Sequence, residues 1–144
     1  MLFGDQLIIV RGGGDLGTGV VSRLHRAGFP VVVLEIAEPL AIRRAVSFAS
    51  AVDGGAITVE GIEAKLADSV AAALELAHSG TVAVMVSPEL PPGLASLAVV
   101  DARLAKRNID TGIDQAPLVV GLGPGFTAGQ DCHAVVETAR GPRL

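Results

Sequence analysis

The segment from Gln6 to Glu35 constrains the fold more than any other part of the sequence. Gln6 to Arg11 is a short apolar run, rich in β-branched residues, that ends at three glycines. Apolar residues then recur at helical spacing over Leu16 to Ala27, before a second, continuously apolar run from Pro30 to Glu35. A strand, a helix and a strand within about 30 residues form a βαβ unit with parallel strands. Runs that are apolar throughout are typical of strands covered on both faces of the sheet.

The rest of the sequence continues this alternation. We expect a helix over Pro39 to Val52, a strand pair that turns at Gly61, and a helix that Asp68 or Ser69 caps and that runs to His78. Further apolar runs predict strands at Thr81 to Ser87, Ala95 to Asp101, Leu118 to Leu122 and His133 to Thr138. Strands and helices that alternate with short connections predict a single α/β domain over residues 1–144, with a mostly parallel sheet flanked by helices.

Composition and charge exclude several classes of partner. The formal net charge of −4 has the wrong sign for broad attraction to nucleic acid or anionic lipid. A single cysteine excludes an internal disulfide framework and a Cys-rich metal site within one chain. The N-terminus does not resemble a signal peptide, and no apolar run approaches the roughly 18 residues that cross a bilayer. We therefore expect a cytoplasmic protein without a nucleic-acid or membrane partner.

The high apolar content has two explanations. Half of the residues are hydrophobic, which fits strands buried on both faces and also fits an apolar interface between subunits. Because a chain of this size has apolar area beyond what its own core covers, we expect a homo-oligomer, most simply a two-fold dimer. A monomer whose apolar residues all lie in the sheet is the alternative.

Gly12 to Gly17 contains a G-x-G-x-x-G pattern between the first expected strand and the first expected helix. In such a loop Gly12 permits the tight turn, Gly14 lets a pyrophosphate approach the backbone, and Gly17 lets helix and strand pack closely. The helix N-terminus offers free N–H groups and a partial positive charge to the phosphates. Glu35 follows 18 residues after Gly17, where a carboxylate accepts hydrogen bonds from ribose hydroxyls. The arrangement predicts a phosphate-containing small molecule as the ligand.

A glycine turn without a ligand is the alternative interpretation of this loop. Asp15 favours that alternative, because its negative charge lies beside the expected phosphates. Under the binding hypothesis Asp15 caps the helix or holds a phosphate-bound Mg²⁺. We count Asp15 and Thr18 among the candidate binding residues of this loop.

A second glycine cluster, from Gly121 to Gly129, again follows an apolar strand. Successive glycines can aim several N–H groups at one point, which makes an anion-binding nest, and a hydroxyl can add to it. The alternative is a wide loop that crosses the sheet edge. The candidate binding residues here are Gly121, Gly123, Gly125 and Thr127.

Asp131-Cys132-His133 follows this loop. Adjacent residues of a strand face opposite sides, so Cys132 and His133 cannot both point into one site, which makes a catalytic pair improbable. We interpret Cys132 as a small buried apolar residue and His133 as a candidate pocket residue.

Asp101 and Arg103 lie where an expected strand ends. The ligand crevice of an open α/β sheet lies outside the carboxyl ends of its strands, so both residues are well placed for binding. A solvated, salt-bridged turn is the competing interpretation, because Lys106, Arg107 and Asp110 follow closely. Since parallel strands end along one edge, we also expect the two glycine loops to line the same crevice.

Several stretches resemble a known family, above all DARLAKRN and GLGPGFTAG followed by HAV and ET. They are similar to the YqeB family, whose members are associated with selenium-dependent molybdenum hydroxylases and are distantly akin to the XdhC/CoxI accessory proteins. The resemblance implies a Rossmann-like three-layer fold and a role in maturing or inserting the molybdenum cofactor. The family's motifs fall on Gly12, Gly14, Asp15 and Gly17, on Asp101, Arg103, Lys106, Arg107 and Asn108, and on Gly121, Gly123, Pro124, Gly125, Asp131 and His133.

The chain departs from the family pattern at two places. Members often have alanine where this chain has Gly13 and Gly17, which loosens the glycine fingerprint. Members also commonly continue beyond the ARG segment at residues 139–141, so we expect this chain to lack a C-terminal region that its relatives have.

Three functions remain open at the level of sequence. The leading hypothesis is an accessory protein that binds a nucleotide, a dinucleotide or a molybdopterin-type ligand. An NAD(P)-dependent oxidoreductase is the enzyme alternative, and its proton-transfer residue would have to be Asp101, Lys106 or His133. The third is a non-catalytic scaffold that contacts a molybdenum hydroxylase.

Overall fold

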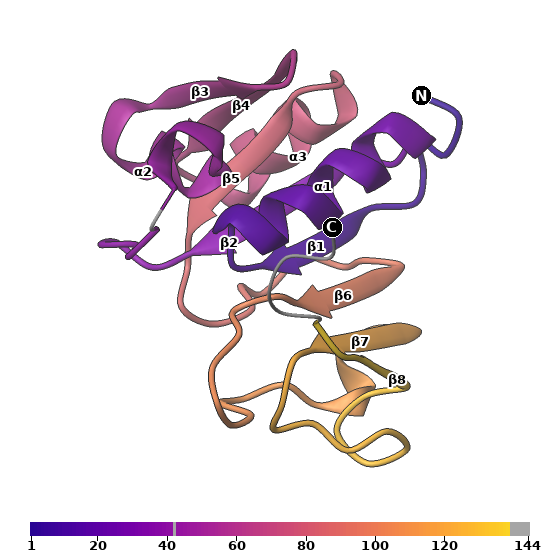
Figure 1. The fold of residues 1–144 in the computed structure, drawn as a ribbon. Coiled ribbons are helices and arrows are strands. Elements are labelled where there is room, and N and C mark those ends of the chain that lie inside the picture. Colours follow the sequence, from indigo (N-terminus) through magenta and orange to yellow (C-terminus); the bar gives the residue numbers. More distant parts are fainter. Residues whose placement is uncertain (42, 139–144) are drawn as a thin grey trace.

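The computed structural model describes residues 1–41 and 43–138. Its eight strands are β1 (Ile8–Arg11), β2 (Val31–Glu35), β3 (Ala56–Val59), β4 (Ile62–Ala67), β5 (Val82–Val86), β6 (Ala98–Asp101), β7 (Leu118–Leu122) and β8 (Ala134–Val136). They form one sheet in the order β3-β4-β5-β2-β1-β6-β7-β8, in which only β3 runs antiparallel to its neighbour (Figure 1). The α-helices are α1 (Asp15–Ala27), α2 (Ala51–Gly54) and α3 (Val70–His78). The expected α/β fold with a mostly parallel sheet is confirmed.

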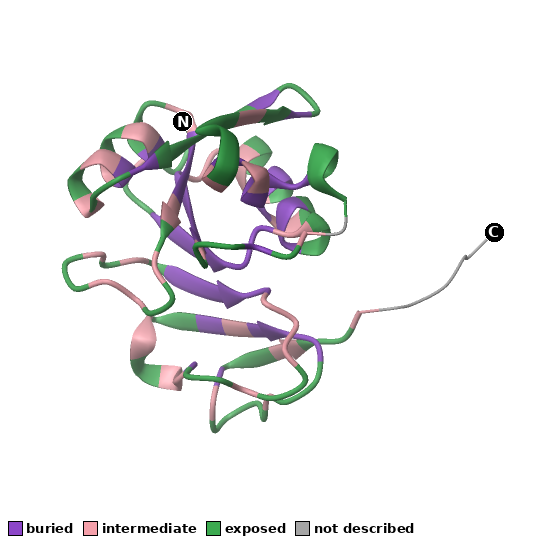
Figure 2. Cartoon of the chain, turned by 90° about the vertical axis from the view of Figure 1, so that its left-hand side faces the viewer, coloured by how far each residue is buried: buried purple, intermediate pink, exposed green. Residues whose placement is uncertain are grey.

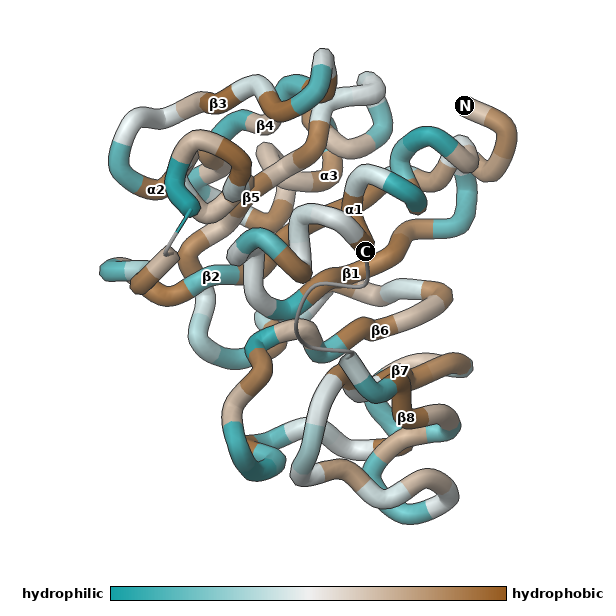
Figure 3. Tube along the Cα trace, viewed as in Figure 1, coloured by the Kyte–Doolittle hydropathy of each residue, from teal (hydrophilic) through white to brown (hydrophobic). Residues whose placement is uncertain are grey.

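The central strands are buried on both faces because α1 and α3 cover opposite sides of the sheet. Ile8 and Val10 pack in the cluster that contains Val21 of α1. Leu7 and Ile9 pack in the other cluster, with the small residues of α3. Figure 2 shows the resulting band of buried residues, and Figure 3 shows that the same strands are strongly hydrophobic. Two-sided burial therefore explains why these runs are apolar without alternation.

The three strands beyond β1 have a thinner cover. The connections 102–117 and 123–133 contain no α-helix, and only a single 3₁₀ turn, Ile113–Gln115, lies between β6 and β7. Burial decreases from β6 to β8 (Figure 2), and 45% of Leu118 and 48% of Val136 are exposed. Part of the apolar content thus remains on the surface, and the expected homodimer stays a prediction. In the described ranges, no helix is long and apolar enough to span a membrane.

Several local signals of the sequence act as expected. Gly28 is left-handed, with φ of 103°, and ends α1. The turn between β3 and β4 has positive φ at Glu60 (51°) and Gly61 (81°). Positive φ at both residues is typical of the two-residue loop that joins the strands of a β-hairpin. Ser69 caps α3, since its hydroxyl oxygen accepts a hydrogen bond from the N–H of Ala72 at 3.1 Å.

The expected helix over Pro39 to Val52 is wrong. The described part of this segment forms two 3₁₀ turns, Arg44–Val46 and Phe48–Ser50, before the single α-helical turn of α2 begins. Ser47 separates the two 3₁₀ turns with an extended backbone, at φ −123° and ψ 124°. A continuous helix would need helical angles there.

Tertiary hydrogen bonds replace the helical ones in this segment. The N–H of Phe48 donates to the hydroxyl oxygen of Thr18 at 2.9 Å, and the N–H of Ala49 donates to the carbonyl of Gly13 at 2.9 Å. In a helix, each of these N–H groups would donate to a carbonyl four residues earlier. The glycine loop therefore determines the shape of the segment that packs on it.

Candidate functional site

A cavity of about 500 Å³ opens at the carboxyl edge of the sheet, above the ends of β1, β2 and β6. Gly12, Gly14 and Gly17 of the glycine loop line it, together with Glu35 and Arg103. Its volume lies within the roughly 300–1,000 Å³ of small-molecule sites. The structure thus brings together six of the candidate residues in one cavity, namely Gly12, Gly14, Asp15, Gly17, Glu35 and Arg103.

Three of the four glycines of the first loop, Gly12, Gly14 and Gly17, lack a side chain for different reasons. Gly12 has φ of 96°, and a Cβ there would lie 2.9 Å from the carbonyl oxygen of Ala102. A Cβ on Gly17 would collide with the carbonyl oxygen of Gly12. A Cβ on Gly14 would meet nothing within 4 Å. The packing of β1, α1 and β6 therefore accounts for Gly12 and Gly17, whereas at Gly14 the space is open toward the cavity.

The N-terminus of α1 offers hydrogen-bond donors to this space. The backbone N–H groups of Gly14, Asp15 and Gly17 have no acceptor within the described residues, whereas the N–H of Thr18 donates to the carbonyl of Gly14 at 2.8 Å. Such a helix start carries a partial positive charge and favours an anion.

Asp15 lies at the same helix end with its side chain exposed. It accepts a hydrogen bond from the N–H of Leu16 at 3.0 Å, and its carboxylate lies 3.8 Å from the guanidinium of Arg43. Across the part of the chain that the structure describes, no three His, Cys, Asp or Glu side chains gather as a metal site. A role of Asp15 in holding Mg²⁺ thus stays a prediction.

The carboxylate of Glu35 is hydrogen-bonded to the glycine loop. Its Oε2 accepts a hydrogen bond from the N–H of Gly13 at 2.7 Å, and its Oε1 accepts one from the N–H of Ile36 at 2.9 Å. Each oxygen keeps a further lone pair for a ligand hydroxyl or N–H group.

Thr18 is a positioning residue of the loop. Its buried hydroxyl donates to the carbonyl of Gly13 at 3.1 Å and accepts from the N–H of Phe48 at 2.9 Å. Thr18 does not appear in the lining of the cavity. The hydroxyl of Thr18 therefore makes its hydrogen bonds within the protein.

A network of four charged side chains lies beside the cavity. Arg11 is 1% exposed and bonds both oxygens of Asp110, at 2.8 and 3.1 Å, and the carbonyl of Pro88 at 2.9 Å. Arg103 donates to both oxygens of Asp101, at 3.0 and 2.8 Å, and to Asp110 at 2.8 Å. Arg11 and Arg103 line the cavity, whereas Asp101 is buried behind them.

The network keeps its carboxylates charged. Burial raises the pKa of Asp101, but hydrogen bonds from Arg103 and Thr111 outweigh it, so this pKa lies below its usual value. Burial also raises the pKa of Asp110, and hydrogen bonds from Arg11 and Arg103 again lower it below the usual value. Burial lowers the pKa of Arg103, but its bonds to the two carboxylates raise it above the usual value. At neutral pH the two carboxylates are therefore anionic and Arg103 is cationic.

The second glycine loop lies at the same edge of the sheet but does not line this cavity. β7 ends beside β6, since Gly121 pairs with Asp101 in register. The glycines of the loop permit close packing: a Cβ on Gly121 would lie 2.5 Å from the ring of Phe126, and one on Gly125 would lie 2.6 Å from the Cα of Arg107. Gly123, with φ of 86°, faces Leu104, which does line the cavity. The loop contacts the cavity wall at Leu104 and lies at the expected edge of the sheet, but none of its residues is in the lining of this cavity, so a shared crevice stays a prediction.

Thr127 and His133 also lie outside the cavity, and both are exposed. The N–H of Thr127 donates to the carboxylate of Asp131 at 3.0 Å. His133 is held against β7, where its Nδ1 accepts from the N–H of Val119 at 2.9 Å. Cys132, as expected, is fully buried. A binding role for the residues of this region stays a prediction.

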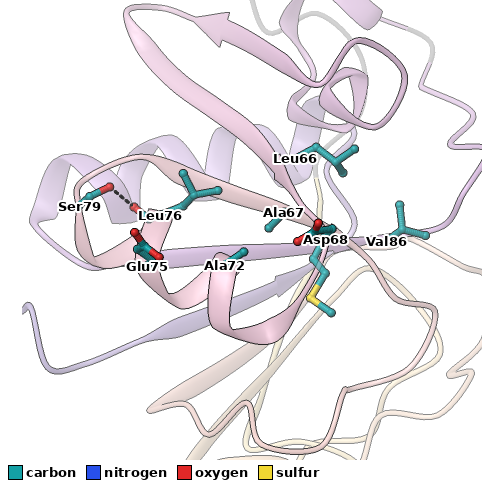
Figure 4. A pocket seen from close by; sticks show the side chains of 9 residues that line it. Leu66, Ala67, Asp68, Ala72, Glu75, Leu76, Ser79 and Val86 are labelled. Carbon is teal, nitrogen blue, oxygen red and sulfur yellow. Dashed lines mark hydrogen bonds between the residues drawn. The ribbon is translucent and has the colours of Figure 1, made fainter.

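A second, larger hollow of about 680 Å³ lies between α3 and the ends of β4 and β5 (Figure 4). Its lining is apolar apart from Ser79 and the carboxylates of Asp68 and Glu75, and Figure 4 shows Asp68 at the strand ends and Glu75 on the helix. The lining includes no Lys, Arg or His side chain and none of the candidate residues. The cavity at the glycine loop is therefore the better candidate for an anionic ligand.

Sequence reasoning missed Arg11 and the apolar mouth of the cavity. Arg11 closes an otherwise apolar strand directly before the glycines, and a charge at that position was the available signal. Exposed apolar side chains surround the mouth, namely Leu16, Ile36, Leu40 and Ile109. They lie in three separate segments of the chain, so their proximity has no signature in the sequence.

Comparison with known proteins finds a similarity that extends over nearly all of this chain. The chain is 53% identical over 140 residues to a protein of Escherichia coli (strain K12) named "Uncharacterized protein YqeB". The match covers 96% of this chain and 26% of that protein, so the chain spans about a quarter of its length. No family model matches the chain, and no solved structure matches it. The identity to YqeB supports the membership of this chain in the YqeB family.

Proposed function

We propose that the cavity above Gly14 binds a phosphate-bearing small molecule, either a nucleotide, a dinucleotide or a molybdopterin-type ligand, on a Rossmann-like domain. The open space at Gly14, next to backbone N–H groups without an acceptor among the described residues, is the observation that carries this proposal. A phosphate in that space would accept hydrogen bonds from the start of α1 and would meet its partial positive charge.

The remaining lining fits the other parts of such a ligand. Apolar side chains at the mouth, among them Leu16, Ile36 and Ile109, offer walls for a flat heterocyclic ring. Glu35 has lone pairs for hydroxyl or N–H groups of the ligand. The cavity therefore offers donors for a phosphate, an acceptor for sugar hydroxyls and an apolar wall for a base, which are the three kinds of group in a nucleotide.

We propose further that the protein is an accessory factor that matures or inserts the molybdenum cofactor of a selenium-dependent molybdenum hydroxylase. This part rests on the family resemblance of the DARLAKRN and GLGPGFTAG stretches and on the similarity to YqeB. The oxidoreductase alternative receives less support, because none of Asp101, Lys106 and His133 lines the cavity. A carrier that binds the ligand needs no proton-transfer residue.

Calorimetry with the Gly14→Val variant tests the binding proposal. Small molecules that co-purify with the native protein are first identified by mass spectrometry, and the identified compound is then titrated. Valine at Gly14 fills the space that the phosphate needs, while the fold has room for it. We expect the affinity to fall at least tenfold.

Gly19→Val is the matched control. Gly19 lies on the same helix, its Cβ would also meet nothing within 4 Å, and it does not line the cavity. We expect this variant to bind like the wild type. Equal affinities of the wild type and Gly14→Val would overturn the proposal.

A further inference from the structure

Two guanidinium groups converge on one carboxylate at the side of the cavity. Asp110 accepts two hydrogen bonds from Arg11, at 2.8 and 3.1 Å, and a third from Arg103 at 2.8 Å. Arg11 comes from β1 and Arg103 follows β6, so two neighbouring strands position the two donors. Paired guanidinium groups at these distances form the arrangement that proteins use to bind phosphate or carboxylate groups of ligands.

Asp110 is the most exposed member of this network. Its side chain is 35% exposed, against 18% for Arg103, 3% for Asp101 and 1% for Arg11. It also belongs to the connection between β6 and β7, whereas Arg11 and Asp101 belong to central strands. Of the four groups, Asp110 can therefore leave with the least disturbance of the sheet.

Both arginines keep a partner when Asp110 is removed. Arg103 retains its two bonds to Asp101, and Arg11 retains its bond to the carbonyl of Pro88. The charges of the network sum to zero with Asp110 present, and to +1 without it. The site would then present a preformed positive group at the wall of the cavity, where both arginines lie.

We infer that Arg11 and Arg103 form an anion subsite for a phosphate group, and that the carboxylate of Asp110 occupies this subsite until a phosphate displaces it. The subsite goes beyond the proposed function, because it does not use the N–H groups of the glycine loop. A ligand with two separated phosphate groups would contact both positions. Displacement of Asp110 would also free the segment that carries Ile109, which lines the mouth.

Calorimetry with inorganic phosphate tests the subsite, at constant ionic strength and with acetate as the second anion. Asp110→Asn removes the competing charge with little change in shape, and we expect it to bind phosphate at least tenfold more tightly than the wild type. Asp114→Asn is the matched control, because it makes the same change four residues away. Within the described residues, the side chain of Asp114 makes no hydrogen bond or ion pair. We expect Asp114→Asn to behave as the wild type.

The double variant Gly14→Val, Asp110→Asn separates this subsite from the glycine loop. We expect it to keep the gain in phosphate affinity, even if Gly14→Val alone abolishes ligand binding. Loss of the gain in the double variant would assign the phosphate to the glycine loop and overturn the inference. Equal affinities of Asp110→Asn for acetate and phosphate would overturn the assignment to phosphate.

A measurement on the wild type covers the case in which Asp110→Asn does not fold. The carboxyl carbon resonances of aspartates are followed by NMR during a titration with inorganic phosphate. We expect the resonance of Asp110 to shift toward that of a solvated carboxylate, while that of Asp101 stays in place. A resonance of Asp110 that is unchanged at the highest attainable phosphate concentration would show that Asp110 is a fixed structural partner.

Discussion

The carboxylate of Glu35 and the N–H of Gly13 are joined by a hydrogen bond of 2.7 Å, which ties the end of β2 to the glycine loop that follows β1. The loop is thus held from two sides, since the carbonyl of Gly13 accepts from Ala49 and from the hydroxyl of Thr18. A peptide group bonded at both ends is preorganised for a ligand, because its ordering does not have to occur on binding.

The bond between Glu35 and Gly13 can be tested with Glu35→Gln. Replacement of a charged acceptor by a neutral amide should lower the free energy of unfolding by about 1–2 kcal/mol. Urea denaturation measures this change. Glu38→Gln is the control, because Glu38 is exposed and makes no ion pair or side-chain hydrogen bond within the described residues. The stability of the Glu38→Gln variant should stay near that of the wild type. Equal stabilities of the two variants would contradict a structural role of the Glu35 carboxylate.

Gly17 and Gly19 should respond oppositely to alanine. The Cβ of Gly17→Ala would press on the carbonyl of Gly12, and such overpacking should cost roughly 1–3 kcal/mol. Gly19→Ala meets open space in the same helix and should stabilise the protein by up to about 1 kcal/mol through helix propensity. Thermal and urea unfolding of both variants check the prediction, which fails if Gly17→Ala is as stable as Gly19→Ala.

Thr18→Val should destabilise the protein more than Thr18→Ser. Valine leaves the N–H of Phe48 without its partner and removes one donor to the carbonyl of Gly13, and each buried unsatisfied group costs roughly 1–3 kcal/mol. Serine keeps the hydroxyl and both hydrogen bonds. The free energies of unfolding distinguish the two. If Thr18→Val were as stable as Thr18→Ser, the hydroxyl would not be needed to hold the loop.

Stability should fall in acid because of Asp101 and Asp110. Their pKa values in the folded protein lie below the ordinary value of 3.8. The stability that each contributes is therefore fully present above the pKa of the unfolded chain and is lost as the pH falls through the folded pKa. Free energies of unfolding measured against pH, in the range below about 5, should show this slope.

Asp101→Asn identifies the source of that slope. We expect a less stable protein whose remaining stability depends less on pH in the acid range, because one titrating group has been removed. Asp114→Asn, at a side chain that makes no hydrogen bond or ion pair within the described residues, serves as the comparison and should retain the slope of the wild type. A slope that is unchanged in Asp101→Asn would assign the acid sensitivity to other groups.

The mass in solution tests the predicted homodimer. Light scattering should give twice the chain mass of 14.6 kDa at micromolar concentration. Val136→Lys, at the exposed edge strand β8, should shift the equilibrium toward the monomer, because a charged edge resists pairing. Leu66→Lys, at a similarly exposed residue of β4, should leave the mass unchanged. A mass that stays at that of one chain would contradict the dimer.

The sequence predicted those parts of the fold that local chemistry determines. The apolar runs of β1 and β2, the helix between them, the turn at Gly61 and the cap at Ser69 each follow from residues close together in the chain. The helix predicted over Pro39 to Val52 is absent, because hydrogen bonds to a distant part of the chain determine the conformation of this segment. Phe48, for example, bonds to Thr18, which lies 30 residues earlier. Such a partner leaves no periodicity to detect.

In the candidate site, too, features that depend on neighbouring residues were predictable and contacts between distant residues were not. The pattern of glycines after β1 predicted the cavity floor, and the register of parallel strands predicted that Arg103 would reach the same edge. The partnership of Arg11 with Asp110 spans 99 positions and could not be predicted, since neither residue belongs to a motif. The second glycine loop was assigned to the crevice because glycines serve close packing and anion binding alike, and the pattern alone does not distinguish them.

Because α-helices cover only one part of the sheet, we expect amide hydrogens in its two parts to exchange with solvent at different rates. Amide hydrogens of β1 and β2, which are buried under helices on both faces, should exchange with solvent only when the whole domain unfolds. Those of β7 and β8 should exchange earlier, through partial opening of the side without an α-helix in its described connections. The glycine loop belongs to the first region, and the wall from Ala102 to Ile109 adjoins the second. We therefore expect the wall from Ala102 to Ile109 to open more readily than the glycine loop, which would widen the cavity on one side.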